Sequence, residues 1–499
     1  MKPSSPRKFL CFIGIILICS SYFAISSSFS VLGIPQPVSI ADRHQIDVIQ
    51  SDNNSHRIKN KMAQPAVGSI RTFWTLNHSS YAHYQVDAEL LAIGNYCYVY
   101  MEDVAIDFLG ESVAIERCES YRDEFDSTIY PSIVDLAGNP NGTLGDIDGD
   151  SRIIILLSTN PVNYYGYENE FEQSIEPYSN LCEMVYIRYT TSYILGVISH
   201  EFHHLILFNH DGNEVPFVYE SLAQFAAKYT GAIIPWDNIT WGVSDFLLHP
   251  EDSLIYWTPN IGGAEAEIDY GSAYLFGLYL AEQFGIEFMR ELVVEDSDGA
   301  EGIMNTLSNM GYNISFNDLY LNWITALTID QPSIADGQYG FHDANATMHS
   351  VGIVSELPYE YNDLPLRCYG FNIRRLVAPP DYFVVDIAYL PAYTIGLSIA
   401  YHDNEGWHIQ QKTQSGGSLV EIVEGSSIDN AYIMTSYLYE NTPSGTIVTG
   451  YGVSTHINLA ILEELPEPTV DWRLLPFVII VGAIMVTGVA LIVWKFKED

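Results

Sequence analysis

The feature that most constrains this chain is a pair of histidines inside an apolar segment. Residues 192–208 read SYILGVISHEFHHLILF, and neither glycine nor proline interrupts the stretch between Val197 and Phe208. Apolar residues on both flanks predict a buried helix here. His200 and His204 are then one turn apart, where side chains lie about 5–6 Å from each other on one helix face. The two imidazole rings can therefore share one small tetrahedral cation.

The residue after the first histidine completes the pattern HExxH. In this pattern the two histidines bind zinc, while the glutamate stays off the metal and takes a proton from the water beside it. We therefore assign His200 and His204 as metal ligands and Glu201 as a general base. His203 falls on another helix face, which favours a structural role. The plain alternative is a histidine-rich helix end with solvated rings, but the apolar flanks would have to bury those rings.

A catalytic zinc site needs a third protein ligand and one open position. His210 stands six residues after His204, as in the metzincin pattern HExxHxxGxxH, but Leu207 takes the place of the glycine that allows the chain to turn. Asp211 belongs to the polar run 209–213, NHDGN, which is typical of the turn that ends a helix.

Glu220 is the preferred third ligand. It opens a second apolar segment, ESLAQFAAKYT, which Gly231 closes, and an antiparallel pair of helices can bring a glutamate beside two histidines. His210 is the main alternative. A simple structural role for Glu220 is also open, because an acidic residue in the first turn of a helix complements the helix dipole.

Several segments resemble the gluzincin metallopeptidases, most nearly the hyicolysin-like and immune-inhibitor-A-like secreted peptidases. The resemblance is carried by HEFHHLI and VYESLAQFA, and by flanking blocks that begin at Phe125 and Tyr270, over roughly residues 68–327. One departure is that Tyr219 and Ser221 flank Glu220, where that family usually has asparagine and glycine. The resemblance implies a zinc endopeptidase that acts on polypeptides, with an α+β, zincin-like domain made of a sheet, the HExxH helix and a helical C-terminal subdomain.

Tyr270 opens the block YGSAYLFGLYLAEQFGIEFMRELV, which predicts an amphipathic helix. In metallopeptidases a tyrosine or histidine often donates a hydrogen bond to the developing oxyanion. Tyr270 is therefore a second candidate catalytic residue, and a packing role is its alternative.

The two ends of the chain predict export and anchoring. Residues 1–30 carry Lys2, Arg7 and Lys8 before an apolar run, as in a signal peptide, with an uncleaved anchor as the alternative. Residues 474–494 contain no charge and have the length of a transmembrane helix. Lysines follow that segment and acids precede it, so we expect a single-pass protein of the cell membrane with an extracellular catalytic domain and a cytoplasmic tail, 495–499.

Between these ends we expect a linker or propeptide over 31–66, a β-rich domain over 67–110, the metallopeptidase domain over 111–335 and a β-sandwich-like domain over 336–465. Alternating aromatic and aliphatic residues support the two β-rich assignments. The expected fold class is thus an α+β peptidase domain flanked by β-rich domains and followed by one C-terminal transmembrane helix.

Asp146, Asp148 and Asp150 form the pattern DxDGD before the apolar run RIIILLS. The pattern is first a turn and second a partial calcium site, because Leu157 stands where an EF-hand loop would have its glutamate.

The remaining composition supports an exported protein that does not bind nucleic acid. The net charge of −41 argues against nucleic acid as a partner. The four cysteines outside the signal segment are compatible with two disulfides, and glycosylation sequons occur along the chain. These residues are Cys97, Cys118, Cys182 and Cys368, and Asn53, Asn77, Asn141, Asn238, Asn313 and Asn345.

Two functions of different classes fit these observations. The first is a membrane-anchored extracellular zinc endopeptidase, and the second is a catalytically inactive cell-surface binding or adhesion protein with a peptidase-like domain. Glu201 favours the enzyme, because a structural zinc site takes a fourth ligand and has no use for a carboxylate at the water position.

Overall fold

The computed structural model describes residues 64–77, 80, 82–140, 148–159, 166–168, 177–231, 242–257, 264–439 and 454–464. All of them lie in one compact unit, Ile58–Asp499. Several predictions therefore concern residues outside the described part. They are the signal peptide (1–30), most of the linker (31–66), Asp146, the sequons at Asn53, Asn141 and Asn238, the segment 474–494 and the tail 495–499.

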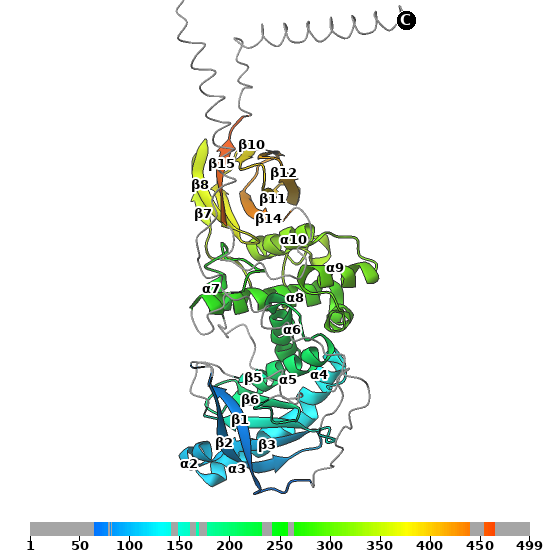
Figure 1. Ribbon diagram of the computed structural model, residues 1–499. Coiled ribbons are helices and arrows are strands. Elements are labelled where there is room, and N and C mark those ends of the chain that lie inside the picture. The colour runs from blue at the N-terminus through cyan, green and yellow to red at the C-terminus, as the bar shows by residue number, and fades with distance from the viewer. Residues whose placement is uncertain are drawn as a thin grey trace, which may run out of the picture. The chain divides into compact units, whose positions relative to one another are not determined.

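The N-terminal half is built on a six-stranded sheet in the order β1-β2-β3-β4-β6-β5 (Figure 1). Strands β3 and β4, and β4 and β6, run parallel, while the other neighbours are antiparallel. The bounds are β1 Ile70–Asn77, β2 Ala82–Ile93, β3 Cys97–Glu102, β4 Ile153–Ser158, β5 Gly166–Glu168 and β6 Met184–Arg188.

Both faces of this sheet are buried along β4, whose sequence is IIILLS. Side chains of a strand alternate between faces, and here Ile153, Ile155 and Leu157 enter the main core. Ile154 and Leu156 enter a separate cluster with Tyr98, Tyr100 and other residues of the sheet. The run therefore has no polar alternation, as expected for a parallel strand covered on both sides.

Helices follow and cover the sheet. Their bounds are α2 Asp103–Leu109, α3 Glu111–Glu124, a π-helical turn Phe125–Ile129, α4 Tyr130–Ala137, α5 Ile194–His210, α6 Pro216–Tyr229, α7 Val243–Phe246, α8 Ala264–Val293, α9 Gly299–Asn309 and α10 Phe316–Ile329. Helix α5 packs against β6 and against α6, and α6 packs against α8. Helix α8 is interrupted at Gly285, whose φ of 83° is not helical.

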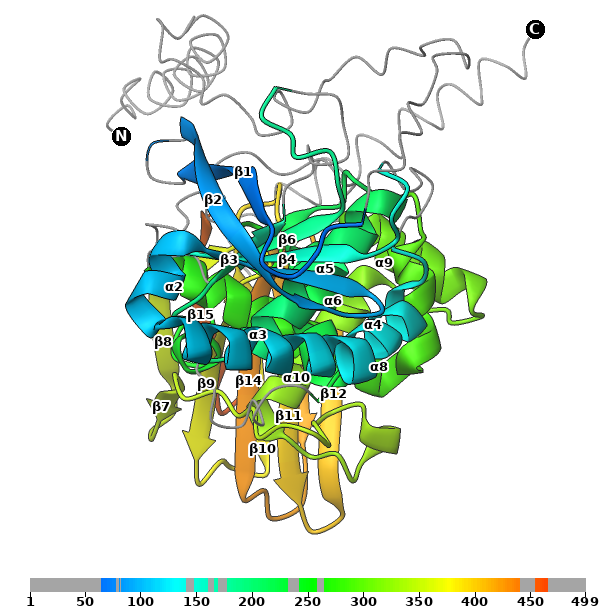
Figure 2. The same cartoon turned by 90° about the horizontal axis from the view of Figure 1, so that it is seen from below.

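The C-terminal half contains two further sheets, in the orders β13-β10-β15-β8 and β12-β11-β14-β9-β7. Figure 2 shows β9, β14, β11 and β12 side by side. Helix α10 packs on this second sheet, where Thr325 Oγ1 lies 2.7 Å from Ser398 Oγ. The bounds are β7 Gly352–Val354, β8 Tyr359–Arg367, β9 Phe371–Val377, β10 Tyr382–Ala388, β11 Thr394–Asp403, β12 Gly406–Ser415, β13 Ser418–Glu424, β14 Asn430–Leu438 and β15 Ser454–Leu462.

The structure differs from the predicted domain organisation near residue 110. Strands β1–β3 were expected to form a separate β-rich domain, yet they continue into the sheet that contains β4 and β6. The physical reason is the parallel pairing of β3 with β4, which joins residues 56 positions apart in the sequence, such as Cys97 and Ile153. A local pattern of alternation does not reveal such a pairing.

The membrane component of the predicted fold class is wrong for the described chain. None of the helices among the described residues combines the length and the apolar character needed to cross a bilayer. The predicted single-pass location, with its extracellular catalytic domain, is contradicted together with that helix. The segment 474–494 itself lies outside the described residues.

The cysteines also differ from expectation. Cys97, Cys118, Cys182 and Cys368 are all buried with free thiols, so the two predicted disulfides do not form. Burial raises the pKa of the Cys118 and Cys368 thiols to about 12, which keeps them protonated at neutral pH.

A close approach of α6 and α8 generates the first testable prediction. A Cβ added at Gly277 of α8 would lie 2.5 Å from the backbone oxygen of Ser221 in α6. Gly277→Ala should therefore lower the free energy of unfolding by about 1–3 kcal/mol, although alanine is the better helix former by about 1 kcal/mol. Urea denaturation measures the change in the free energy of unfolding, and Gly277→Ser should lower it by at least as much. A Gly277→Ala variant that is more stable than the wild type would contradict this close packing.

Candidate metal centre

Two helices supply the side chains of the candidate centre. His200, Glu201 and His204 lie on α5, and Glu220 lies on α6. All four are buried, with exposed fractions of 6%, 6%, 8% and 2%. Helix α6 begins at Pro216, a residue suited to the first helical position. Glu220 therefore stands in the second turn, beyond the reach of the dipole role that applies to a first-turn glutamate.

The three candidate ligand atoms meet at one point. His200 Nε2 and His204 Nε2 are 2.9 Å apart. Glu220 Oε2 lies 3.2 Å from His200 Nε2 and 3.6 Å from His204 Nε2. The ligands of a tetrahedral zinc ion with bonds of about 2.0–2.1 Å are roughly 3.3 Å apart, so these separations bracket the required spacing.

Glu201 is a second carboxylate at the same place. Its oxygen and the nitrogens of His200 and His204 all lie within 4.8 Å of one another, so these three residues alone could also hold a metal. We assign the ligand role to Glu220 because its Oε2 lies 3.2 Å and 3.6 Å from the two ring nitrogens, close to the spacing that a zinc ion requires. Glu201 is then left beside the metal position, where the HExxH pattern has its proton acceptor.

The protonation of the cluster follows from burial and from mutual charge. Burial opposes ionisation of Glu220, but the facing rings of His204 and His200 hold its pKa well below the ordinary value. Burial alone would lower the pKa of His200, yet hydrogen bonding to Glu220 and the charges of Glu220 and Glu201 raise it. Burial and the neighbouring His200 lower the pKa of His204. An anionic Glu220 and a neutral His204 suit a cation, whereas the raised pKa of His200 means that a cation would compete with a proton at that ring.

The alternative third ligands point elsewhere. The His210 ring approaches α4, since its Nε2 lies 3.6 Å from the position of a Cβ added at Gly138. The metal-sized cluster among the described residues is His200, Glu201 and His204; Glu220 joins it through its separations from the two rings, and no such separation is found for His210 or Asp211. Asp211 follows α5 at its C-terminal cap.

An aromatic residue that the sequence did not single out contacts the histidines. The ring of Tyr219 lies 4.5 Å from the ring of His204, measured between centroids. The ring of Tyr270 packs edge-on against the ring of Trp257, with 5.0 Å between their centroids. Tyr219 directly precedes Glu220, so the only signal for it in the sequence is its position beside the ligand.

The outer side of the histidine pair is apolar. Nδ1 of His200 and Nδ1 of His204 are buried and have no hydrogen-bond partner among the described residues. Ligating histidines usually donate this second N–H to a carboxylate or a carbonyl oxygen, and that support is missing here within the same residues. His203 is fully buried, and burial lowers its pKa well below the ordinary value, which agrees with its assignment to the other face of α5.

The DxDGD turn has its own partners. Asp148 Oδ1 accepts a hydrogen bond from the backbone N–H of Asp150 at 2.8 Å. The Asp150 carboxylate accepts from Tyr98 Oη at 2.6 Å and from Arg152 Nη1 at 3.0 Å. Calcium at this turn stays a prediction, and the Asp150 oxygens already have protein donors.

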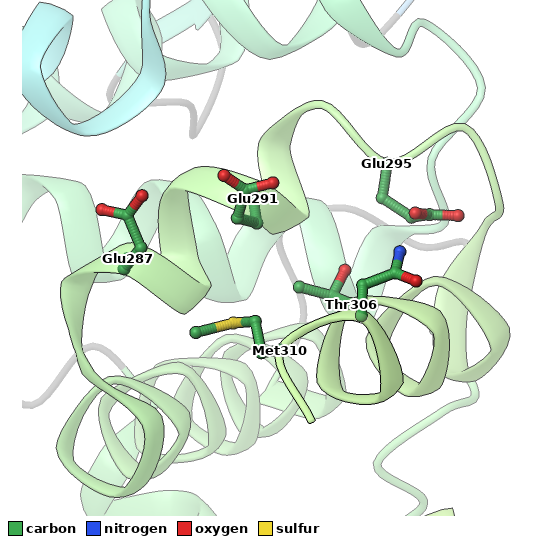
Figure 3. Close-up of a pocket in the computed structure, with 6 residues that line it drawn as sticks. Glu287, Glu291, Glu295, Thr306 and Met310 are labelled. Atoms are coloured by element: carbon green, nitrogen blue, oxygen red, sulfur yellow. The ribbon is translucent and has the colours of Figure 1, made fainter. Parts of the chain in front are cut away.

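A cavity of about 260 Å³ lies away from the histidines, between the last turns of α8 and α9 (Figure 3). It is lined by Glu287, Glu291, Glu295, Thr306, Asn309 and Met310. Glu287 and Glu291 of α8 and Glu295, two residues after its end, make the lining of this cavity acidic.

No known family matches the chain, and no curated protein sequence matches it. Several solved structures are similar to parts of it, and three of them serve as examples. A pre-peptidase C-terminal domain of a Bacillus anthracis collagenase is 9% identical, covers 22% of this chain and 94% of its own, and has a TM-score of 0.15. The surface-associated copper-binding protein CorA of Methylomicrobium album BG8 is 8% identical, covers 23% of this chain and 100% of its own, and has a TM-score of 0.16. The periplasmic lysozyme inhibitor PliG of Aeromonas hydrophila is 11% identical, covers 22% of this chain and 96% of its own, and has a TM-score of 0.15. Likenesses of this size bear on neither fold nor function.

The geometry predicts that Glu220, and not His210, sets metal affinity. Glu220→Gln keeps the volume of the side chain but removes its charge, so zinc affinity should fall by more than about 100-fold. His210→Ala should leave the affinity unchanged. Competition with a chromophoric chelator measures both, and the opposite ranking would make His210 the third ligand.

Proposed function

We propose that this protein is a zinc-dependent endopeptidase of the gluzincin type, in which His200, His204 and Glu220 hold the metal. The observation that carries the proposal is the meeting of the Glu220 carboxylate with both imidazole rings on a buried helix pair, with Glu201 beside them. The segments that resemble gluzincins include this same pair of helices.

The donor set favours zinc over other common cations. Two imidazole nitrogens and one carboxylate oxygen are ligands that zinc accepts, whereas calcium and magnesium prefer oxygen alone. Three protein ligands leave one position of a tetrahedron open, as in catalytic zinc sites. A zinc ion held there would supply a Lewis acid for a substrate carbonyl and would lower the pKa of a bound water to about 7.

Glu201 performs the proton transfers in this proposal. Its carboxylate accepts a proton from the attacking water and later delivers that proton to the leaving amide nitrogen. No covalent intermediate with the protein is needed. Burial of α5 around the site excludes bulk water, which strengthens the interaction between the carboxylate and the charges that develop beside it.

Two tyrosines compete for the role of oxyanion donor. Tyr270 is the candidate from the sequence, and Tyr219 is the tyrosine that contacts His204. Replacing the tyrosine that donates to the oxyanion by phenylalanine should lower kcat and leave zinc affinity unchanged, because only the hydroxyl is lost. Replacing the other tyrosine should leave kcat unchanged. Tyr270→Phe and Tyr219→Phe are therefore a matched pair of variants.

The decisive prediction concerns Glu201→Gln. The wild-type protein should cleave peptides from a mixed library, lose this activity when the metal is removed by a chelator and regain it with zinc. Glu201→Gln should keep its zinc but lose at least about 10²–10⁴-fold in kcat/KM, because the amide cannot accept the proton.

Zinc content by mass spectrometry and peptide cleavage by chromatography are measured on the same samples. Zinc binding without cleavage in both proteins would favour the binding or adhesion function, and equal cleavage by both would exclude Glu201 as the base.

A further inference from the structure

One face of the five-stranded sheet continues beyond the part that α10 covers. Helix α10 contacts this face at Ser398 of β11, through the side chain of Thr325. Ala400 and His402 follow two and four residues further along β11, and they lie on the same face because the side chains of a strand alternate. Figure 2 shows β9, β14, β11 and β12 running on past α10. The end of this face is therefore formed by side chains of the strands themselves.

Two aromatic rings meet across β11 at this end of the face. Trp407 comes from β12 and Tyr432 from β14, and their centroids are 6.4 Å apart with 31° between the ring planes. Ala400 lies on β11 between these strands and has no exposed surface, whereas both rings are partly exposed. The His402 ring lies 5.3 Å from the Trp407 ring. The guanidinium carbon of Arg375, on β9, lies 5.7 Å from the centroid of Tyr432.

Hydrogen bonds fix the polar side chains beside these rings. Arg375 Nη2 donates to Asn430 Oδ1 at 2.9 Å, and Asn430 Nδ2 donates to Asp429 Oδ1 at 3.2 Å. The same Asp429 oxygen lies 3.0 Å from His402 Nδ1. The side chains of His402 and Asp429 are 36% and 60% exposed, so a ligand can reach them. Because these polar groups are already held in place, a ligand that bonds to them pays little for ordering them.

The chemistry of this row favours a neutral sugar. One face of a hexose ring presents C–H groups that pack on an aromatic ring, and its hydroxyl groups both donate and accept hydrogen bonds. An apolar peptide or a lipid surface would instead leave the polar side chains without partners. The charges of Arg375 and Asp429 are close to balanced within the row. The net charge of −41 of the whole chain repels an acidic polysaccharide.

We propose that Trp407, Tyr432, Arg375, Asn430 and His402 form a binding site for a neutral hexose polysaccharide. Neighbouring strands are about 4.8 Å apart, so a row across β12, β11, β14 and β9 is about 14 Å long and exceeds one sugar ring. Consecutive sugars pack on the two rings, and their hydroxyls bond to the polar side chains. The site shares no residue with the zinc centre, and it does not rest on the proposed peptidase function.

Calorimetric titration of the full chain with neutral hexasaccharides of glucose, of mannose and of galactose tests the proposal. At least one of them should bind with a Kd below about 1 mM. The corresponding monosaccharide should bind at least about 10-fold more weakly, because it covers only part of the row. The proposal is overturned if none of the three hexasaccharides binds, or if the monosaccharide binds equally well.

Substitutions assign the binding to the row. Trp407→Ala should weaken the hexasaccharide at least about 10-fold, because it removes one of the two stacking surfaces. Tyr432→Ala should do the same, and it serves as the second variant if Trp407→Ala does not fold. Unchanged affinity in the folded variant would place the sugar elsewhere and overturn the assignment.

Tyr361 of β8, in the other sheet, provides a matched control. Its ring is 40% exposed and lies 5.2 Å from the guanidinium carbon of Arg374, so it too is an exposed tyrosine beside an arginine. It packs against no second ring among the described residues. Tyr361→Ala should therefore keep the full affinity, and an equal loss in this variant would contradict a site at Trp407 and Tyr432.

Two further measurements separate this site from other functions. Glu201→Gln should bind the hexasaccharide as tightly as the wild type, so loss of peptide cleavage and loss of sugar binding are distinct outcomes. A second copy of the chain is the other candidate occupant of the row. Wild type and Trp407→Ala should sediment alike in analytical ultracentrifugation. A wild-type dimer that Trp407→Ala dissociates would assign the row to self-association and overturn the proposal.

Discussion

The candidate centre depends on one tertiary contact, between a buried carboxylate on α6 and two imidazole rings on α5. Burial makes an isolated Glu220 anion unfavourable, and the rings that face it reverse that preference. The same contact requires α6 to lie close to α5. Because Gly277 has no side chain, α8 can pack closely against the backbone of α6 at Ser221. Helix packing and electrostatics therefore act on the same contact. A change in the separation of α5 and α6 would alter both the packing and the charge interaction of Glu220 with the two rings.

The composition explains why the carboxylates Glu220 and Glu214 contact histidines and backbone N–H groups instead of lysines or arginines. With 62 acidic and 21 basic residues, few lysines and arginines are available to neutralise carboxylates in the interior. Glu220 faces two histidine rings, and Glu214 accepts hydrogen bonds from the backbone N–H groups of Val215 and of Gly299 at the start of α9. Asp211 has one oxygen without either.

Local chemistry allowed the α5 helix and the spacing of His200 and His204 to be predicted, because both follow from a helical repeat within twelve residues. Glu220 was harder, since its approach to the histidines depends on a loop and on the starting point of α6. The parallel pairing of β3 with β4 could not be read from the strands themselves, and neither could the absence of cysteine pairing, because both depend on which distant segments meet. The membrane helix was inferred from hydropathy alone, and no helix of the described residues fits it.

The start of α6 at Pro216 has a consequence for how such a chain can change. Proline at the first helical position fixes where the helix begins, and each residue after it turns the side chains by about 100°. Glu220 therefore owes its direction to the count of residues from Pro216. A residue inserted between these two positions would turn the carboxylate away from the histidines, whereas an insertion before Pro216 would only lengthen the loop. The direction of the Glu220 side chain is therefore set by its distance in sequence from Pro216. The four-residue spacing between Pro216 and Glu220 is the part of α6 least free to vary in length.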